Sequence, residues 1–181
     1  MRVITGSARG TRLEAPPGLS TRPTSEMCKE AVFSILHFEL AEARVLDLFA
    51  GSGQLGIEAL SRGAVTCDFV DASPEAFAVV RENCRAARVE MKSKLHNCDA
   101  FAFLAAARGP FDLVLLDPPF GHDTLARVLP ELSRIVAPGG VVLCESEREA
   151  FLPETAGELA RARQYTYGRI LVTRYEKRAQ D

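Results

Sequence analysis

The 181-residue chain lacks tryptophan and contains only three tyrosines, three histidines and five cysteines. The cysteines are odd in number, and no two stand in the C-x-x-C spacing of a zinc site or a dithiol redox centre. Most of them fall at apolar strand or helix positions, so we expect reduced thiols in a cytoplasmic protein. The histidines show no ligand spacing, which argues against a metal site.

Long apolar runs are also missing. Hydrophobic residues make up 47% of the chain, but no stretch approaches the length of a membrane span, and the N-terminus does not resemble a signal peptide. We therefore expect no membrane association. The length favours one domain, residues 1–181, large enough to bury a core.

The net charge is only −2, but it is unevenly distributed. Residues 1–25 carry a net charge of +3 and residues 161–178 one of +5, whereas residues 26–160 carry −9. If the two basic ends meet on one face, they form a rim that could bind phosphates. The alternative is an ordinary solvated surface.

Strand and helix patterns alternate through the middle of the chain. Strands are predicted over 44–49, 65–71, 93–98, 111–117 and 141–144, and helices over 54–62, 74–87, 100–107 and 123–136. A closing pair of strands follows over 162–167 and 169–176. This order predicts an α/β fold, a doubly wound Rossmann-like sheet with an antiparallel tail.

The first forty residues are predicted to form a hairpin and a helix. The hairpin pairs 2–6 with 10–15 across a glycine-containing turn. The helix runs from Ser25 to about Leu40 and is capped by Thr24. Its predicted apolar face consists of Met27, Ala31, Ile35 and Leu36.

The strand predicted over 111–117 ends in the tetrapeptide Asp-Pro-Pro-Phe at 117–120. Two successive prolines stop a strand and a helix alike, because each lacks an N–H and has a fixed φ. The Asp117 carboxylate and the Pro118 carbonyl can accept both hydrogens of an exocyclic amine, and Phe120 can stack on its ring. Ligands of open α/β sheets bind at this end of the strands. The sequence therefore predicts a site for an aryl amine; the alternative is a loop in which Asp117 caps the next helix.

Gly51, Gly53 and Gly56 follow the first core strand with the spacing G-x-G-x-x-G and precede a helix. Such glycines allow a tight turn and a close approach of a ligand beside the positive helix N-terminus. Asp71 ends the next strand twenty residues after Gly51, where a carboxylate can accept hydrogen bonds from ribose hydroxyls. This pattern predicts an adenosine-containing cofactor, either NAD or S-adenosylmethionine.

Two further carboxylates bear on that choice. Asp47, four residues before Gly51, would repel a pyrophosphate but suits the ammonium group of S-adenosylmethionine. Asp99 ends the third strand, where it could take the adenine amino group. It fits equally well as the N-cap of the following helix.

Beyond these motifs the chain carries Val-Ile-Thr-Gly at 3–6, Arg-Pro-Thr-Ser-Glu at 22–26, Glu-Ala-Leu-Ser-Arg-Gly at 58–63 and Tyr-Gly at 167–168. With them, nearly the whole chain resembles the bacterial 16S ribosomal RNA guanine-N2 methyltransferases of the RsmD family. The glycine loop and the Asp-Pro-Pro-Phe segment are common to amino-methyltransferases. The Arg-Pro-Thr block and the N-terminal segment are specific to the family.

The resemblance implies S-adenosylmethionine-dependent methylation of the exocyclic N2 of one guanine in 16S rRNA, on a seven-stranded class I methyltransferase sheet. The catalytic residues that it implies are Asp117, Pro118 and Phe120. The cofactor-binding residues that it implies are Asp47, Ala50, Gly51, Ser52, Gly53, Asp71, Ala72, Asp99 and Ala100.

The same resemblance implies an RNA-contacting extension, residues 1–22, ahead of a catalytic core, residues 23–181. Arg9, Arg12 and Arg22 would contact phosphates there, with an affinity that falls as salt rises. The chain has little room for sequence readout of its own. We therefore expect a monomer that acts on 16S rRNA within a small-subunit assembly intermediate, without a membrane or a metal.

Four other functions remain possible. An adenine-N6 DNA methyltransferase uses a similar Asp-Pro-Pro-Phe segment but usually needs an added recognition segment, and a protein-glutamine methyltransferase prefers Asn at position 117. An NAD-dependent oxidoreductase shares the glycine loop but has no use for the paired prolines. A non-catalytic RNA-binding assembly factor would tolerate the loss of Asp71 and Asp117.

Overall fold

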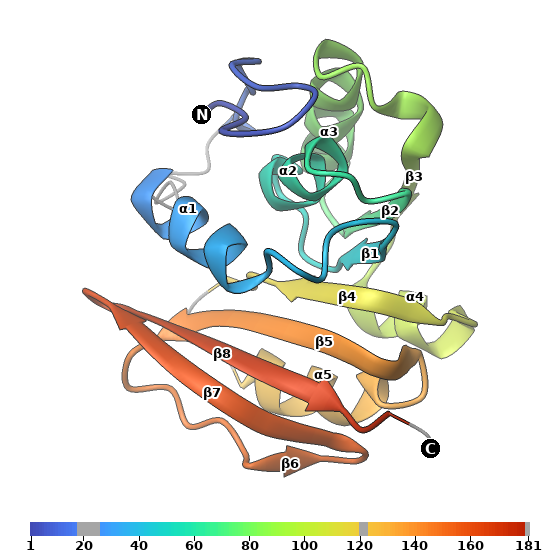
Figure 1. The fold of residues 1–181 in the computed structure, drawn as a ribbon. Helices are drawn as coiled ribbons and strands as arrows, with labels where there is room; N and C mark the ends of the chain where they lie inside the picture. Colours follow the sequence, from blue (N-terminus) through green and yellow to red (C-terminus); the bar gives the residue numbers. More distant parts are fainter. Residues whose placement is uncertain (18–25, 120–122, 180–181) are drawn as a thin grey trace.

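A computed structural model describes residues 1–17, 26–119 and 123–179, which form one continuous sheet flanked by helices (Figure 1). The strand order is β3-β2-β1-β4-β5-β8-β7-β6. The strands in this order are Ser93–Asn97, Thr66–Asp71, Arg44–Asp47, Phe111–Leu116, Val136–Glu147, Ile170–Lys177, Leu159–Tyr167 and Thr155–Ala156. The first five are mutually parallel, and the last three pair antiparallel. The doubly wound sheet with an antiparallel tail is confirmed, but it has eight strands in place of seven because the two-residue β6 extends it.

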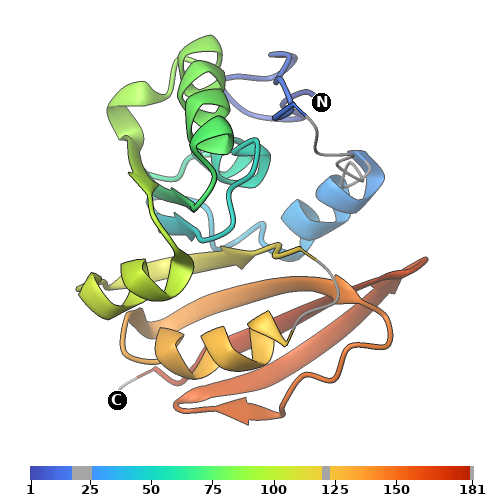
Figure 2. The same ribbon diagram turned by 180° about the vertical axis from the view of Figure 1, so that it is seen from behind.

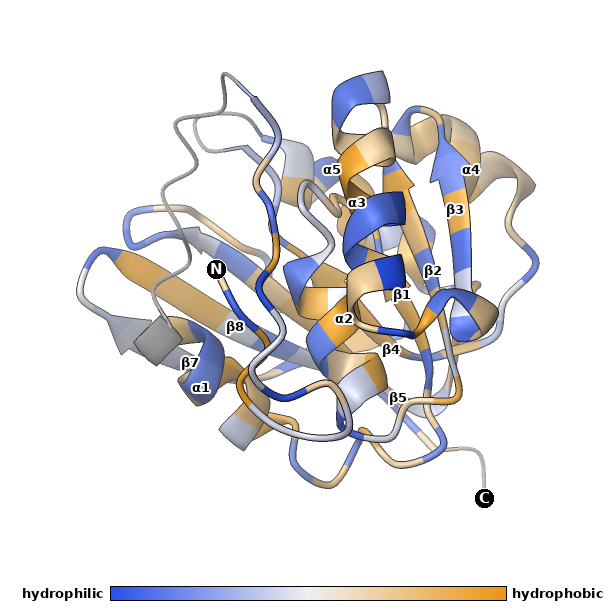
Figure 3. Cartoon of the chain, turned by 90° about the horizontal axis from the view of Figure 1, so that it is seen from above, coloured by the Kyte–Doolittle hydropathy of each residue, from blue (hydrophilic) through white to orange (hydrophobic). Residues whose placement is uncertain are grey.

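Helices cover both faces of this sheet. One face is covered by α1 (Glu26–Ile35), α2 (Gln54–Ser61) and α3 (Pro74–Ala86), and the other by α4 (Ala100–Ala106) and α5 (Thr124–Leu132) (Figures 1 and 2). A 3-10 turn, η1 (Glu90–Lys92), precedes β3. Each face has its own apolar cluster, and the central strands contribute alternate residues to the two. Figure 3 shows helices of mixed apolar and polar colouring packed around the strands of the sheet.

The prediction for the first helix was wrong in its end and its buried face. Helix α1 stops at Ile35, where Arg174 of β8 donates from Nη1 to the Ile35 carbonyl at 3.3 Å and from Nη2 to Glu39 at 2.6 Å. This cap comes from a residue 139 positions away, so no local signal announces it. Ile35 and Ala31 are only partly buried, and the helix instead buries Cys28, Lys29, Val32 and Phe33. Of the predicted face Leu36 is buried, but it follows the end of the helix. The Thr24 cap and the Met27 side chain lie outside the described residues.

Lys29 explains why the buried face was misread. Its side chain is 1% exposed, and its ammonium group donates to the Arg2 carbonyl at 2.6 Å and lies 3.6 Å from Glu58. Hydrophobic periodicity counts a lysine as an exposed position. A lysine is buried when a partner compensates its charge, and here that partner comes from α2.

The fifth helix and the strand after it also differ from the prediction. Helix α5 ends at Leu132 rather than residue 136, and β5 begins at Val136 and continues through residues 138–140. The Pro-Gly-Gly sequence there was read as a break between elements. It is instead a bulge in the strand, marked by a register shift opposite Phe111–Leu113 and by Gly139 at φ +76°. Bulges are where a sheet accepts proline and glycine.

The predicted N-terminal hairpin is present in short form, with an antiparallel bridge between Arg2 and Arg12. Backbone hydrogen bonds join its two arms: the Leu13 N–H donates to the Met1 carbonyl at 2.9 Å, and the Val3 N–H donates to the Thr11 carbonyl at 2.9 Å. Helix α2 also holds the hairpin, because the fully buried Glu58 carboxylate accepts the backbone N–H of Ile4 at 2.8 Å and that of Thr5 at 3.0 Å.

The two basic segments do not form one rim. The N-terminal loop lies over α1 and α2, whereas β7 and β8 lie at the opposite edge of the sheet (Figures 1 and 2). Arg161, Arg174 and Lys177 are largely buried and bind backbone carbonyls or carboxylates within the fold. Much of the C-terminal positive charge is therefore structural.

Candidate active site

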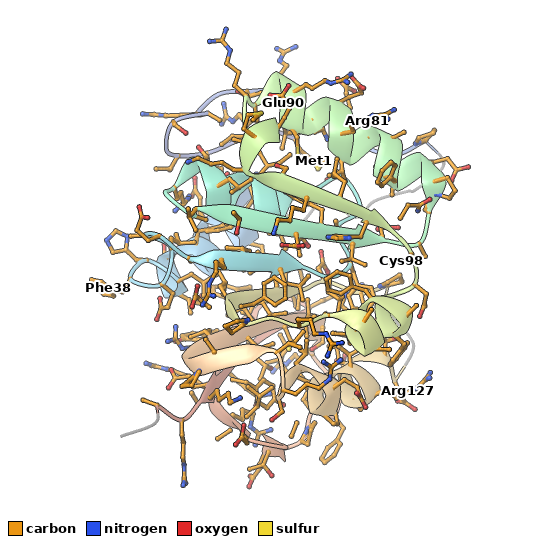
Figure 4. The ribbon with its side chains drawn as sticks, turned by 90° about the vertical axis from the view of Figure 1, so that its right-hand side faces the viewer. Met1, Phe38, Arg81, Glu90, Cys98 and Arg127 are labelled. Carbon is orange, nitrogen blue, oxygen red and sulfur yellow. The ribbon has the colours of Figure 1, made fainter. Side chains whose placement is uncertain are left out.

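Three carboxylates lie on one face of the sheet near the carboxyl ends of neighbouring strands. Asp47 ends β1, Asp117 follows β4, and Glu145 lies near the end of β5. Leu116 pairs with Cys144, so Asp117 and Glu145 occupy the next positions along two adjacent parallel strands and project to the same side. In Figure 4, Cys98 lies on the side of the molecule where the parallel strands have their carboxyl ends, and Phe38 projects from the opposite side.

The glycine loop turns tightly between β1 and α2. The Gly53 N–H donates to the Ala50 carbonyl at 2.6 Å, and Gly53 has φ +77°, a conformation that L side chains rarely adopt. Gly56 serves packing instead, since an added Cβ would lie 2.3 Å from the Phe69 ring on β2. The predicted G-x-G-x-x-G turn is thus present. Gly53 is required for its backbone conformation, and Gly56 is required for close packing against β2.

Asp47 and Asp71 hold the glycine loop through hydrogen bonds from backbone N–H groups. Asp47 is 1% exposed and accepts the Gly56 N–H at 2.9 Å. Asp71 accepts the Gly51 N–H through one oxygen at 2.8 Å and the Ser73 N–H through the other at 2.9 Å. Both predicted cofactor residues therefore lie at the loop, where they orient backbone N–H groups.

The remaining predicted cofactor residues lie on the same edge of the sheet. Asp99 is the N-cap of α4, and its Oδ1 accepts the N–H groups of Phe101 at 2.9 Å and Ala102 at 3.2 Å. The capping alternative for Asp99 is therefore correct, and any contact with adenine would come in addition to it. Ala100 is buried directly behind the cap.

Pro118 and Pro119 border a cavity of about 180 Å³. Asp117 is partly buried and Pro118 is buried, and both leave β4 at its carboxyl end. The cavity is lined by Pro118, Pro119 and the end of β5, and Phe151 stands at it with 88% of its surface exposed. Phe120 and Arg22, two residues that the resemblance implied, lie outside the described residues.

Burial, followed by the like charges of neighbouring carboxylates, raises the pKa of two of these carboxyl groups. Burial, together with the charges of Asp117 and Asp71, raises the pKa of Asp47 to about 7. Burial, followed by the charges of Asp117 and Asp47, raises the pKa of Glu145 to about 8. A bound cation would relieve this repulsion, and the ammonium and sulfonium groups of S-adenosylmethionine are such cations. The residues present therefore fit that cofactor.

Two residues of the site were missed by sequence reasoning. Glu145 ends a buried apolar strand just as Asp117 does, so the same pattern could have found it. Asn83 of α3 had no such signal: it is 2% exposed and donates to the Ser52 carbonyl at 2.8 Å and the Glu14 carbonyl at 2.9 Å. It thereby ties the glycine loop to the N-terminal segment.

Among the residues that the structure describes, no group of three or more histidines, cysteines, aspartates or glutamates is placed to hold a metal ion. None of the helices described is long and apolar enough to cross a membrane.

Comparison with known proteins decides the family. A family model described as Conserved hypothetical protein 95 matches residues 1–176. The chain is 31% identical over 182 residues to "Ribosomal RNA small subunit methyltransferase D" of Escherichia coli K12, covering 99% of this chain and 91% of that protein. The chain belongs to the RsmD family.

Two further relatives support this assignment. "Putative rRNA methyltransferase YlbH" of Bacillus subtilis is 40% identical over 183 residues, with 98% of this chain and 100% of that protein covered. The solved structure named "Putative methyltransferase yhhF from Escherichia coli" is 32% identical with a TM-score of 0.87 and 99% of both chains covered. The RsmD-family fold thus extends over the whole chain, including its antiparallel tail.

Proposed function

We propose that this RsmD-family protein transfers the methyl group of S-adenosylmethionine to the exocyclic N2 of a guanine in 16S rRNA. The observation that carries the proposal is the position of Asp117 and Pro118, two acceptors at the carboxyl end of β4, which pairs with β1 directly before the glycine loop. Family membership and the names of the relatives support an rRNA substrate.

Asp47 and Asp71 would hold the cofactor through the loop that they orient, with Ala50, Ser52 and Ala72 at the same turn. When bound, S-adenosylmethionine supplies an electrophilic methyl group on a sulfonium centre. Asp47 lies nearest the methionine end and Asp71 nearest the ribose in this assignment. Ionised Asp47 would balance the ammonium, which lowers the cost of its burial.

Asp117 and Pro118 would activate the attacking amine. An aryl amine is a weak nucleophile because its lone pair is delocalised into the ring. Two acceptors that draw both hydrogens out of the ring plane localise that lone pair. Asp117 then stabilises the positive charge that develops on nitrogen during methyl transfer, and the proton can leave afterwards. In the same proposal Phe120 stacks on the target base, which must be extruded from its RNA context.

The N-terminal segment would supply part of the RNA contact. Arg9 and Arg12 are exposed on the segment that α2 holds in place, and Arg22 has the same role in this proposal. A segment fixed by a buried carboxylate presents its cations at defined positions, which suits recognition of a folded RNA by shape. We propose a small-subunit assembly intermediate in the cytoplasm as the substrate, and a monomer as the active form.

A methyl-transfer assay tests the reaction. Labelled S-adenosylmethionine is offered with small subunits that lack the modification, with naked 16S rRNA and with duplex DNA, and the product nucleoside is identified. N2-methylguanosine from the subunit or its rRNA is the expected product. Methyladenine in DNA would move the assignment to an adenine-N6 DNA methyltransferase.

A further inference from the structure

Glu145 is a buried acid that the proposed reaction does not yet use. It is 3% exposed and stands beside Asp117 on the same face of the sheet. Its Oε2 lies 4.0 Å from the Cys28 thiol of α1, which is a weak donor. Its Oε1 has no hydrogen-bond partner within the described part of the chain.

The surroundings of Glu145 leave it short of a donor. The charged groups that act on it are Asp117 and Asp47, both acids, and together with burial they raise the pKa of its carboxyl group. An orphaned buried acceptor is uncommon in folded proteins and often marks a place where a ligand completes the hydrogen bonding. A group arriving there with an N–H would satisfy Oε1 and favour the ionised carboxylate.

Resting on the proposed function, we propose that Glu145 accepts the N1–H of the target guanine and thereby selects guanine over the other bases. Neighbouring strands lie about 4.8 Å apart, so two carboxylates at adjacent positions can meet two neighbouring donors on one base edge. Guanine presents such a pair, the N2 amine and N1–H, and Asp117 already takes the amine.

The other amino bases do not match this pair. In adenine and in cytosine the ring nitrogen beside the amine is an acceptor, so its lone pair would face the Glu145 carboxylate. A site built to receive an N–H discriminates strongly against a base that lacks it, because its own acceptor is then left unpaired. Glu145 would therefore be a specificity-determining residue. Because Oε1 is covered in the structure, the base must displace the groups that now cover it.

The test uses rRNA that carries either guanine or 2-aminopurine at the methylated position, prepared by ligation. Both bases offer the same N2 amine, but 2-aminopurine has an acceptor at N1. For the wild-type enzyme we expect kcat/KM to favour guanine by roughly ten- to a hundredfold. Glu145→Gln should shrink this ratio at least severalfold, because the amide can donate to the 2-aminopurine N1.

Glu90→Gln is the matched control, since Glu90 is exposed on the η1 turn before β3, away from β4 and β5; its preference for guanine over 2-aminopurine should equal that of the wild type. Equal use of both bases by the wild-type enzyme would overturn the inference without any variant. A Glu145→Gln ratio identical to that of the wild type, with a wild-type melting temperature, would overturn it too. In those cases guanine is still methylated; absence of N2-methylguanosine from the unsubstituted RNA would instead overturn the proposed function.

Discussion

The two halves of the candidate active site differ in how their carboxylates are supplied with hydrogen-bond donors. On the glycine-loop side, Asp47, Asp71 and Asp99 each accept backbone N–H groups from an adjacent turn or helix. On the β4–β5 side, Glu145 has an oxygen without a donor in the described structure, next to Asp117. The first half is complete before any ligand binds, and the second half is arranged for donors that a substrate would bring.

The two halves of the site therefore affect the free energies of binding and folding in different ways. Backbone N–H groups fix the loop in the geometry that a cofactor needs, which lowers the entropic cost of binding. Crowded acids near Asp117 cost stability in the absence of ligand, and that cost is recovered when cations or N–H donors arrive. The comparison therefore predicts that the two halves respond differently to mutation.

The largest effect is expected for Asp117→Ala. Turnover should fall by roughly a hundred- to a thousandfold, because an electrostatic contact to the developing charge is lost. S-adenosylmethionine affinity, measured by calorimetry, should change little, since the loop does not depend on this residue. Asp112→Ala, at the other end of β4, is the control and should turn over normally. Normal turnover by Asp117→Ala would remove the assigned role.

A second change should break the loop side alone. Asp71→Ala removes the acceptor of both the Gly51 and the Ser73 N–H groups, so cofactor affinity should fall roughly ten- to a hundredfold. Turnover at saturating cofactor should be closer to normal. The exposed Glu75→Ala nearby serves as the comparison variant. A loss of turnover with unchanged cofactor affinity would contradict this division of labour.

The crowding of acids predicts a pH effect on stability. The pKa of Asp47 is raised from 3.8 to about 7 in the folded protein, so the folded state retains a proton that the unfolded chain has released. Its contribution is therefore complete below about pH 4 and is lost as the pH rises toward 7. Denaturant unfolding of the ligand-free protein should show this fall, and Asp47→Asn should reduce it to the part that comes from Glu145.

Asp112 should contribute a pH dependence of stability opposite to that of Asp47 in the same experiment. The hydrogen bond from Arg44 holds the pKa of the Asp112 carboxyl below its usual value, so its contribution is present at neutral pH and is lost as the pH falls. Asp112→Asn should therefore change stability near neutral pH and leave the loss between pH 4 and 7 intact. A wild-type stability that rises over that range would contradict the crowding argument.

The smallest effect is expected at the RNA contact. The double variant Arg9→Gln, Arg12→Gln should weaken rRNA binding severalfold and reduce the slope of log affinity against log salt by about 1 to 2. Arg85→Gln, whose cation is paired with Glu82 on α3, should leave the slope unchanged. An unaltered slope in the double variant would place the RNA contact elsewhere.

The local sequence determined the parts of this protein that depend on neighbouring residues. Sequence patterns located β1 to β4 and α2 to α4 to within a few residues. Apolar runs mark β1, β2 and β4 because these strands are buried on both faces, and apolar residues at helical spacing mark the helices. The glycine spacing and the paired prolines located the two turns of the site because each turn is built from its own backbone.

Only the tertiary structure decided what depends on contacts between distant segments. The end of α1 is set by Arg174, the burial of Lys29 by Glu58, and the link between the glycine loop and the N-terminal segment by Asn83. The neighbourhood of Asp117 and Glu145 likewise follows from strand register rather than from any spacing in the chain. Charge and hydrogen-bond partners act through space, so a side chain's environment, and with it the chemistry of this site, became definite only once the sheet was assembled.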